Sequence, residues 1–421
     1  MAREQNWTRN FVINLGATAA PSTIVLVLIV VLSQSAQAQT FKVIYNFTRG
    51  QDGYSPSSLA IDKRGNLYGT TLAGGSYTEG AVFKLTRSGS SWLFSNLYSF
   101  QAGNDGALPM ARPVIGPNGS LYGTTELGGT GPCYSGMYRV GCGTVFNLQP
   151  PLRAPISVFA SWVKTTLYSF PGDYGQWPTT DVTVDPAGNV YGTMTTGGGL
   201  GNVYELMPSG GGWLWSRLYS FPGGQNGSTP ESGVTLDPAG NVYGTTLSGG
   251  NSGCGTVYEI SPSGPGRTYQ VLHSFSGSDG SDPIGDLIRD TAGNLYGTTV
   301  GGCDGYDGTV FELSPSGAGW TFTVLYQFTE PYQGSAATLA MDPAGNLYGT
   351  TTVGSGNDPY GSVFKLAPSG NGWTYTTLYT FTGKSDGGGP TSVVLDSMGN
   401  IFGTAGSGGA SGNGVVFEIT P

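Results

Sequence analysis

Four aspartates in two short segments are the best candidates in this sequence for binding a metal ion. They are Asp279, Asp282, Asp304 and Asp307. Hard cations such as Ca²⁺ take six to eight oxygen ligands, often from flexible aspartate-rich loops. The four carboxylates therefore predict a calcium site. Because their spacing is not that of the twelve-residue EF-hand loop, the alternative is a set of Asp-Gly turns in which each aspartate bonds its own backbone.

The composition offers little support for catalysis. The single histidine, His273, replaces the tyrosine of a recurring Leu-Tyr-Ser-Phe segment, which favours an ordinary strand residue. A Ser-His-Asp triad or a histidine-ligated metal would require this one residue. A glycosidase pair drawn from the four aspartates would also need a defined cleft. We predict that the protein is not an enzyme and has no cofactor beyond the calcium ion considered above.

Aromatic residues in the predicted loops suit sugar binding. Exposed rings beside acids and amides can stack on saccharides, and packing between neighbouring units is the alternative. The candidate ligand-binding residues are Tyr134, Tyr138, Trp177, Tyr306 and Tyr360. Five other tryptophans recur at the start of one predicted strand per unit, which indicates a scaffold role: Trp92, Trp162, Trp213, Trp320 and Trp373.

The charge balance argues against nucleic acid as a partner. The chain carries 17 basic and 26 acidic residues, a net charge of -9, whereas a nucleic-acid binder needs a basic footprint. The recurring Tyr-Gly-Thr-Thr glycines do not form a phosphate-binding loop, since no Gly-Lys-Ser/Thr follows them.

The first 38 residues have the pattern of an export signal. Arg3 and Arg9 precede an apolar run over residues 24–32, and Ala36-Gln37-Ala38 provides a small-residue cleavage site. The run is shorter than the ~20 residues that span a bilayer, although an uncleaved anchor is the alternative. We predict a signal peptide over 1–38 and a mature domain over 39–421 without a transmembrane segment, exported to the periplasm, the cell surface or the medium.

An internal repeat organises the rest of the chain. The motif Gly-Asn-Leu-Tyr-Gly-Thr-Thr recurs seven times, at spacings of 54, 69, 52, 53, 52 and 54 residues. Its aromatic positions are Tyr68, Tyr122, Tyr191, Tyr243, Tyr296, Tyr348 and Phe402. Each unit divides into four short strands separated by Pro-Ala-Gly-Asn, Gly-Gly and Pro-Ser-Gly turns. Most of the 73 glycines fall in these turns and loops.

Seven units of about 53 residues with four antiparallel strands each predict an all-β fold, a seven-bladed β-propeller. The mature region opens with a lone fourth strand, Phe41–Phe47, and ends with a third strand, Val415–Thr420. The first strand can therefore complete the last blade and close the ring, which removes the open sheet edges.

The arrangement of blades makes predictions about faces and cysteines. The short, uniform turns lie on one face and indicate structural work, whereas the loops between second and third strands vary and form the candidate binding face. Cys133 and Cys142 share one inserted loop, and Cys254 and Cys303 occupy loops of neighbouring units. Because an exported chain favours disulfides, we predict the pairs Cys133–Cys142 and Cys254–Cys303.

The repeat resembles the choice-of-anchor tandem repeat GloVer-containing proteins of bacteria. The Asp-Pro-Ala-Gly-Asn-Leu-Tyr-Gly-Thr-Thr segment at 342–351 is a complete copy of the characteristic unit, and Gly-Thr-Val-Phe at 308–311 is a second signature. The resemblance covers the whole mature region. It implies an exported repeat protein and no particular chemistry.

These observations predict an exported, monomeric binding module. Its partner would be a glycan or an extracellular protein held by the variable face. A structural component of the envelope or matrix is the first alternative. A polysaccharide-acting enzyme that uses loop carboxylates is the second.

Overall fold

The computed structural model describes residues 39–421, apart from 152–160, 173–175, 197–199, 264–265, 302, 304–307, 318, 330–333, 335–337, 352–358 and 371. The predicted signal peptide, residues 1–38, lies outside the described residues. Within residues 39–421 the chain is all-β, and seven antiparallel sheets form seven blades numbered along the chain.

Each blade runs from a short inner strand to a long outer one. The strands of blades 1 and 2 are β2 (Tyr54–Pro56), β3 (Ala60–Ile61), β4 (Leu67–Ala73), β5 (Ala81–Ser88) and β6 (Ser91–Ser99), then β7 (Val114–Ile115), β8 (Leu121–Thr125), β11 (Thr144–Gln149) and β12 (Val163–Ser169). Those of blades 3 and 4 are β13 (Thr183–Val184), β14 (Val190–Met194), β15 (Asn202–Ser209) and β16 (Gly212–Ser220), then β17 (Thr235–Leu236), β18 (Val242–Thr246), β19 (Thr256–Ser263) and β20 (Gly266–Ser274).

The remaining blades repeat this order. Blades 5 and 6 contain β21 (Ile288–Arg289), β22 (Leu295–Thr298), β23 (Thr309–Ser316) and β24 (Gly319–Gln327), then β25 (Ala340–Met341), β26 (Leu347–Thr350), β27 (Ser362–Ser369) and β28 (Gly372–Thr380). Blade 7 contains β29 (Gly388–Leu395), β30 (Ile401–Ser407), β31 (Val415–Thr420) and β1 (Thr40–Asn46). Outside the blades lie the hairpin strands β9 (Tyr134–Ser135) and β10 (Tyr138–Arg139) and the 3-10 turns η1 (Gly103–Asp105), η2 (Pro117–Gly119) and η3 (Gly224–Asn226).

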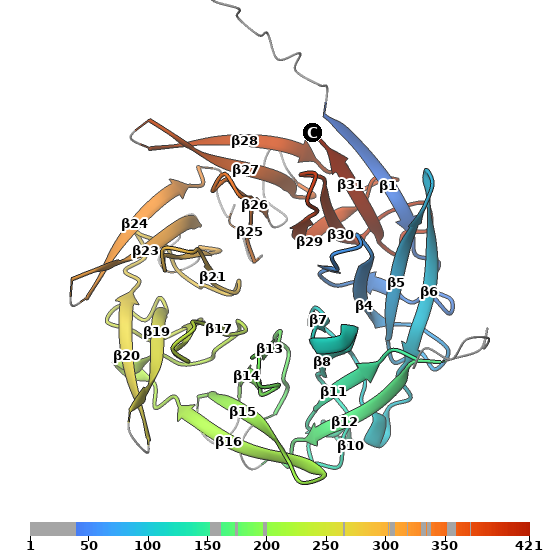
Figure 1. Ribbon diagram of the computed structural model, residues 1–421, viewed down its shortest axis with the longest axis horizontal. Helices are drawn as coiled ribbons and strands as arrows, with labels where there is room; N and C mark the ends of the chain where they lie inside the picture. Colours follow the sequence, from blue (N-terminus) through green and yellow to red (C-terminus); the bar gives the residue numbers. More distant parts are fainter. Residues whose placement is uncertain are drawn as a thin grey trace, which may run out of the picture. The chain divides into compact units, whose positions relative to one another are not determined.

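The ring closes as predicted. β1 is the outer strand of blade 7 and pairs antiparallel with β31, from Thr40 opposite Thr420 to Asn46 opposite Val415. Figure 1 shows this pairing where blue and red strands meet, with the inner strands of all blades around a central opening. One blade built from both ends of the domain leaves no unpaired edge between the first and last blades.

A phenylalanine wedge fills each junction between blades. The last residue of the recurring Leu-Tyr-Ser-Phe segment is buried in every blade and meets an aromatic ring of the next blade at centroid distances of 5.2–5.7 Å. Phe47 against Phe83 and Phe221 against Tyr258 are examples. Such edge-to-face contacts add to the gain from burying apolar surface.

The glycine of Tyr-Gly-Thr-Thr follows from the same wedge. Gly69 of β4 lies opposite Phe83 of β5, and a Cβ atom on Gly69 would approach that ring to 2.5 Å. The equivalent glycines of the other six repeats meet a phenylalanine or tyrosine ring in the same way. A side chain in this column would therefore displace the ring that seals the junction.

The first threonine of the motif joins neighbouring blades. The hydroxyl of Thr70 in blade 1 donates to the carbonyl of Ala111 in blade 2 at 3.0 Å, and that of Thr404 in blade 7 donates to the carbonyl of Ser57 in blade 1 at 2.8 Å. The second bond joins the last blade to the first. The motif is thus a structural unit that fixes each blade to the next.

Both predicted disulfides are confirmed. Cys133 is joined to Cys142 within the inserted loop of blade 2, and Cys254 is joined to Cys303 between blades 4 and 5. Among the described residues, no helix is long and apolar enough to cross a membrane.

Candidate functional site

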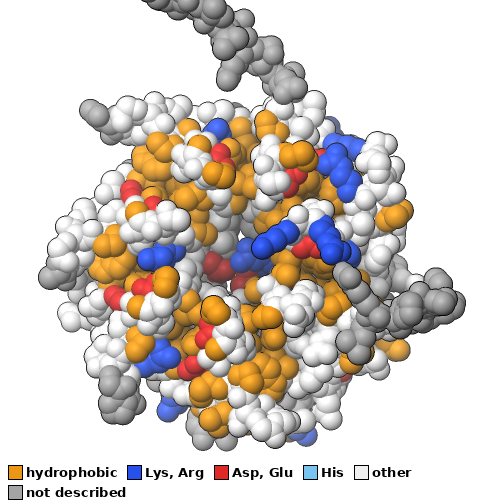
Figure 2. All heavy atoms as spheres, in the orientation of Figure 1, with side chains coloured by type: hydrophobic (Ala, Val, Ile, Leu, Met, Phe, Trp, Pro, Cys, Tyr) orange, Lys and Arg blue, Asp and Glu red, His pale blue; other side chains and the backbone are white. Residues whose placement is uncertain are grey.

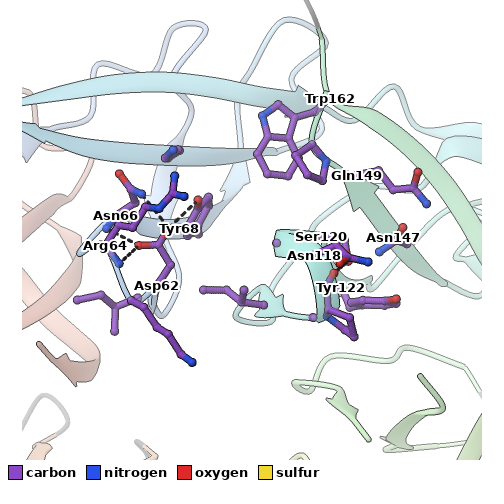
Figure 3. Close-up of a pocket in the computed structure, with 18 of the residues that line it drawn as sticks. Asp62, Arg64, Asn66, Tyr68, Asn118, Ser120, Tyr122, Asn147, Gln149 and Trp162 are labelled. Atoms are coloured by element: carbon purple, nitrogen blue, oxygen red, sulfur yellow. Dashed lines mark hydrogen bonds between the residues drawn. The ribbon is translucent and has the colours of Figure 1, made fainter. Parts of the chain in front are cut away.

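A cavity of about 1080 Å³ opens between blades 1 and 2 on the side of the ring that carries the short turns. We call it the blade 1–2 cleft. Its floor and walls come from the turn over 62–66, the turn over 116–120, strands β5 and β11, and Trp162. In Figure 3, Asp62, Arg64, Asn66 and Tyr68 face Asn118, Ser120 and Tyr122 across the cavity.

The blade 1 wall is basic because its turn departs from the common Pro-Ala-Gly-Asn sequence. Lys63 and Arg64 replace proline and alanine and are exposed. Lys84 of β5 places its Nζ 5.5 Å from the centre of the Tyr68 ring, in a cation–π contact. Among the described residues, none of the three cations forms an ion pair.

The one acid of this wall is already engaged. Asp62 accepts hydrogen bonds from the backbone and side-chain amides of Asn66 at 2.9 and 2.8 Å, from the Arg64 backbone at 2.8 Å and from the Tyr68 hydroxyl at 3.2 Å. Burial raises the pKa of Asp62, but these bonds outweigh it, so the pKa lies below its ordinary value. The carboxylate therefore organises the turn and leaves the lysines free to face the cleft.

Among the described residues, the blade 2 wall contains no acid. Gly116 stands where six blades have the aspartate of the turn, and a Cβ atom there would come within 2.3 Å of the Tyr122 ring. Tyr122 consequently makes no hydrogen bond to another described residue, unlike the equivalent tyrosines of blades 1 and 3 to 6. Asn147 of β11 occupies the position that is glutamate in blades 3, 4, 5 and 7.

Trp162 completes the cleft beside the tyrosine of blade 1. Its ring meets Tyr68 edge-on at a centroid distance of 6.4 Å, and Trp92 and Trp320 pack in the same way on the preceding blades. The scaffold role predicted from its periodicity is therefore found, but Trp162 also lines the cavity. The cleft thus combines an indole, two phenol rings, amides and unpaired cations.

The central opening holds a second polar cluster, made by one column of the repeat. In blades 1 to 6 the column lies two residues before β3, β7, β13, β17, β21 and β25, and in blade 7 it lies within β29. Its residues are, from blade 1 to blade 7, Ser58, Arg112, Asp181, Gly233, Asp286, Thr338 and Ser392. Arg112 Nε lies 2.9 Å from Asp181 Oδ2, and its Nη2 lies 3.7 Å from Asp286 Oδ2. Acidic and basic side chains are visible in the opening in Figure 2.

Backbone amides hold both carboxylates in place. The N–H of Arg112 donates to Asp181 Oδ1 at 2.6 Å, and the N–H of Gly233 donates to Asp286 Oδ1 at 2.6 Å. A Cβ atom at Gly233 would lie 3.0 Å from Asp286 Oδ1, so glycine in this column makes room for the carboxylate. Burial and the neighbouring charge of Asp181 raise the pKa of Asp286 to about 7, against the opposing effect of Arg112.

The predicted ligand-binding residues lie in separate loops. Tyr134 and Tyr138 are 58% and 76% exposed on the hairpin β9–β10, whose Arg139 bonds back to the carbonyls of Thr130 and Gly131. A cavity of about 550 Å³ lies beside this hairpin, but neither tyrosine lines it.

The other three aromatic residues do not join them in one site. Trp177 is half-buried at φ 63°, and its buried indole N–H has no hydrogen-bond partner among the described residues. Tyr360, in blade 6, is exposed and its ring covers Gly383. Tyr306 lies outside the described residues. Their role in binding stays a prediction.

Two of the four aspartates of the predicted calcium site, Asp279 and Asp282, lie among the described residues. Asp279 accepts bonds from His273 Nε2 at 2.9 Å and from the backbone of Ser276 at 2.7 Å, and burial raises the pKa of Asp282. Asp304 and Asp307 lie outside the described residues. Within the described part of the chain, no three His, Cys, Asp or Glu residues are grouped as metal ligands. The calcium site stays a prediction.

His273 behaves as a strand residue. Its ring stacks on Phe322 of the next blade at 3.7 Å between centroids, and its Nε2 faces Asp279. Burial lowers the pKa of His273 despite that carboxylate. The histidine therefore packs a junction between blades.

Sequence reasoning missed both polar sites, although each leaves a signal. The cleft is marked by departures from the repeat at Lys63, Arg64, Gly116 and Asn147. The cluster in the central opening is marked by charged residues in a column that elsewhere holds glycine or hydroxyl side chains. The turns of blades 1 and 2 depart from the common sequence and line a cavity, and the expectation that the turns do structural work stays a prediction.

The repeat and the ring together define a β-propeller built from one bacterial repeat. A family model described as the Gloeobacter/Verrucomicrobia repeat matches residues 30–162 and 133–339, and the chain belongs to this family. No curated protein matches the sequence.

Two solved structures are similar to this chain at low sequence identity. A 6-phosphogluconolactonase, provisionally so described, from Bacteroides uniformis is 13% identical, covers 83% of this chain and 89% of its own, and has a TM-score of 0.51. The PQQ-bound aldose sugar dehydrogenase from Streptomyces coelicolor is 12% identical, with coverages of 90% and 98% and a TM-score of 0.44. These similarities concern the fold alone.

Proposed function

We propose that the protein is an exported, non-enzymatic glycan-binding module and that the blade 1–2 cleft is its binding site. The observation that carries the proposal is the lining of the cleft. Trp162 and Tyr122 supply apolar ring faces, and Asn118, Asn147 and Gln149 supply amide groups. Ligand sites commonly combine aromatic surface with a few polar groups that fix orientation.

Export is supported by the two disulfides, because such bonds persist in oxidising compartments. The proposed module acts as a monomer on a saccharide outside the cytoplasm. The alternative, a structural component of the envelope, predicts that no saccharide binds to the cleft.

A glycan array followed by calorimetry on the whole chain tests the proposal. We expect Trp162→Ala to weaken binding at least about tenfold, since stacking on an indole is lost. Trp320→Ala is the matched control, because Trp320 has the same position and the same packing on the preceding blade but does not line the cleft.

Three outcomes distinguish the hypotheses. Equal loss of binding in both variants would trace the effect to the scaffold. Loss on Trp177→Ala or Tyr138→Ala, with Trp162→Ala unaffected, would place binding on the loop side. Absence of binding to any saccharide would favour the structural role.

A second function, cleavage of a saccharide in the central opening, has one observation in its favour. Asp181 and Asp286 share a site in which the pKa of Asp286 is raised to about 7, and acid–base pairs in glycosidases have separated pKa values. Both carboxylates already bind Arg112, which makes binding in the cleft the better proposal. Release of reducing ends from a polysaccharide panel, abolished by Asp286→Asn, would favour cleavage.

A further inference from the structure

We infer that the blade 1–2 cleft selects acidic glycans, with carboxylate or sulfate groups on the sugar. This inference rests on the proposed glycan-binding function and specifies its ligand. It follows from the charges of the cleft, which are opposite to those of the chain as a whole.

In two other junctions the position of Lys84 holds a glutamate, which pairs with an arginine of the next blade. The cations of the cleft form no such ion pair among the described residues. At the blade 3–4 junction Glu205 occupies the position of Lys84 and pairs with Arg267 at 3.4 Å. At the blade 7–1 junction Glu418 occupies it and pairs with Arg87 at 3.5 Å. Lys84 has no such partner among the described residues, and Asn147 across the cleft is neutral.

Among the described residues, three positive groups therefore line one cavity, and its one acid, Asp62, accepts hydrogen bonds from Asn66, the Arg64 backbone and Tyr68. Because the net charge of the chain is -9, an anion approaching other surfaces is repelled on average. The cleft is thus a local site of attraction on an acidic molecule.

The positions of the cations suggest how an acidic sugar would lie. Lys63 and Arg64 are exposed at the rim, where they can attract a charged chain. Lys84 and Trp162 both contact the Tyr68 ring, at 5.5 and 6.4 Å, on one side of the cavity. A saccharide stacked on the indole could therefore place its anionic group near the Lys84 ammonium.

The test compares probes that share a skeleton and differ in charge. Oligogalacturonate and its fully methyl-esterified form are titrated into the whole chain by calorimetry, with a sulfated oligosaccharide as a further arm. We expect the carboxylate form to bind at least about tenfold more tightly than its ester, given that a single contact between opposite charges is worth about fivefold in water. The preference should shrink as salt is raised, because exposed charges are screened.

Variants of the cleft should remove the preference without unfolding the protein. Lys84→Gln and the double variant Lys63→Gln/Arg64→Gln should each reduce the ratio of acid to ester binding at least about fivefold. Lys365→Gln is the matched control, because Lys365 lies 5.6 Å from the Tyr348 ring in blade 6 and lines no part of the cleft.

The inference and the proposed function fail in different ways. Equal binding of acid and ester, both weakened by Trp162→Ala, would overturn the charge selection and keep the glycan site. Preference for the acid that is equally reduced by Lys365→Gln would overturn the assignment to the cleft. A protein that binds neutral saccharides only, or none of the acidic probes, would overturn the inference outright. Tighter binding of the sulfated arm than of the carboxylate would identify sulfate as the recognised group.

Discussion

The junctions between blades 1 and 2 and between blades 3 and 4 differ in the residues at the same positions of the repeat. One junction forms an ion pair at these positions, and the other forms a cavity lined by cations. In the blade 3–4 junction, Arg267 takes the position that Trp162 has in blade 2. Its guanidinium pairs with Glu205, which also accepts a bond from the Tyr191 hydroxyl at 2.7 Å. The arginine and the glutamate of this junction therefore neutralise each other. In the blade 1–2 junction Lys84 replaces the glutamate, and Gly116 replaces the turn aspartate of blade 2. A cavity lies between these two blades.

The difference shows how a repeat fold acquires a site. All seven junctions have the phenylalanine wedge, and six of them have the threonine bond among the described residues, so the outer turn positions can vary without opening the ring. At the blade 1–2 junction, changes of charge or size at a few of these positions occur together with a cavity. Function can therefore be added to one junction while the other six keep the fold.

The largest effect should come from breaking the balanced junction. Arg267→Ala leaves Glu205, whose side chain is 10% exposed, without its cation, and we expect a loss of about 3 kcal/mol of unfolding free energy. Lys84→Ala should cost about 0.5 kcal/mol, because it removes a partly exposed residue that has a cation–π contact with Tyr68 but no ion pair. Urea unfolding of the two variants measures both values.

Restoring neutrality provides the control for this prediction. The double variant Glu205→Gln/Arg267→Ala should regain most of the stability, since no buried charge is left unpaired. If it stays as unstable as Arg267→Ala, packing of the arginine side chain, rather than charge balance, closes the blade 3–4 junction.

The central opening tests charge balance in a third arrangement, in which one cation faces two acids. The pKa of Asp286 is raised to about 7 from 3.8, so between these values the folded state binds more protons than the unfolded state. Stability should therefore fall as pH rises from about 4 through 7. Asp286→Asn keeps an acceptor for the Gly233 amide and removes the titration, so its Tm should exceed that of the native chain by a few °C at pH 8.

Thermal unfolding at pH 5, 6, 7 and 8 measures this effect. Asp181→Asn is the control, because it removes the 2.9 Å partner of Arg112 and should lower Tm across the whole range. Parallel pH profiles for the native chain and Asp286→Asn would show that Asp286 stays ionised beside Arg112.

A smaller effect should follow from giving the cleft the acid that other blades carry. Asn147→Glu introduces the glutamate found at 205 and 259, both of which are buried in the same register. We expect binding of an acidic saccharide to weaken about fivefold, with the neutral ester unaffected. Met398→Glu, on the exposed turn of blade 7, adds the same charge away from the cleft and should change neither affinity.

The fold could be predicted because its causes are local and repeated. Gly69 and its six equivalents and the phenylalanine wedge recur with the repeat, whose count gives the number of blades. The lone strand at the start of the domain and the third strand at its end then give the closure by β1. The disulfides followed from adjacency of blades. Each of these inferences needs only the order of the strands.

The sites could not be predicted in the same way, because they arise where the repeat fails. Gly116 and Asn147 are visible departures in the sequence, but a departure from the repeat need not create a site. Arg267, for example, replaces a tryptophan, and its charge is paired with Glu205 of the neighbouring blade. Whether Lys84 has a partner depends on which side chains of blade 2 lie across the junction. The same holds for Arg112, whose partner Asp181 is 69 residues away and whose second acid, Asp286, lies three blades along the ring.

The smallest effect concerns the two tyrosines of the compared junctions. Tyr191 donates to Glu205 at 2.7 Å and to Asp185 at 3.3 Å, and both burial and these carboxylates raise its pKa. Tyr191→Phe removes one donor from each of the two acids, which keep their bonds to Arg267 and Asn189, and should cost about 1 kcal/mol. Tyr122→Phe should change stability by less than about 0.3 kcal/mol, because the Tyr122 hydroxyl has no partner among the described residues. If unfolding shows equal losses, Tyr122 has a partner in the folded chain and the cleft is more closed than its lining indicates. If Tyr122→Phe is stable but binds saccharide more weakly, the hydroxyl belongs to the ligand.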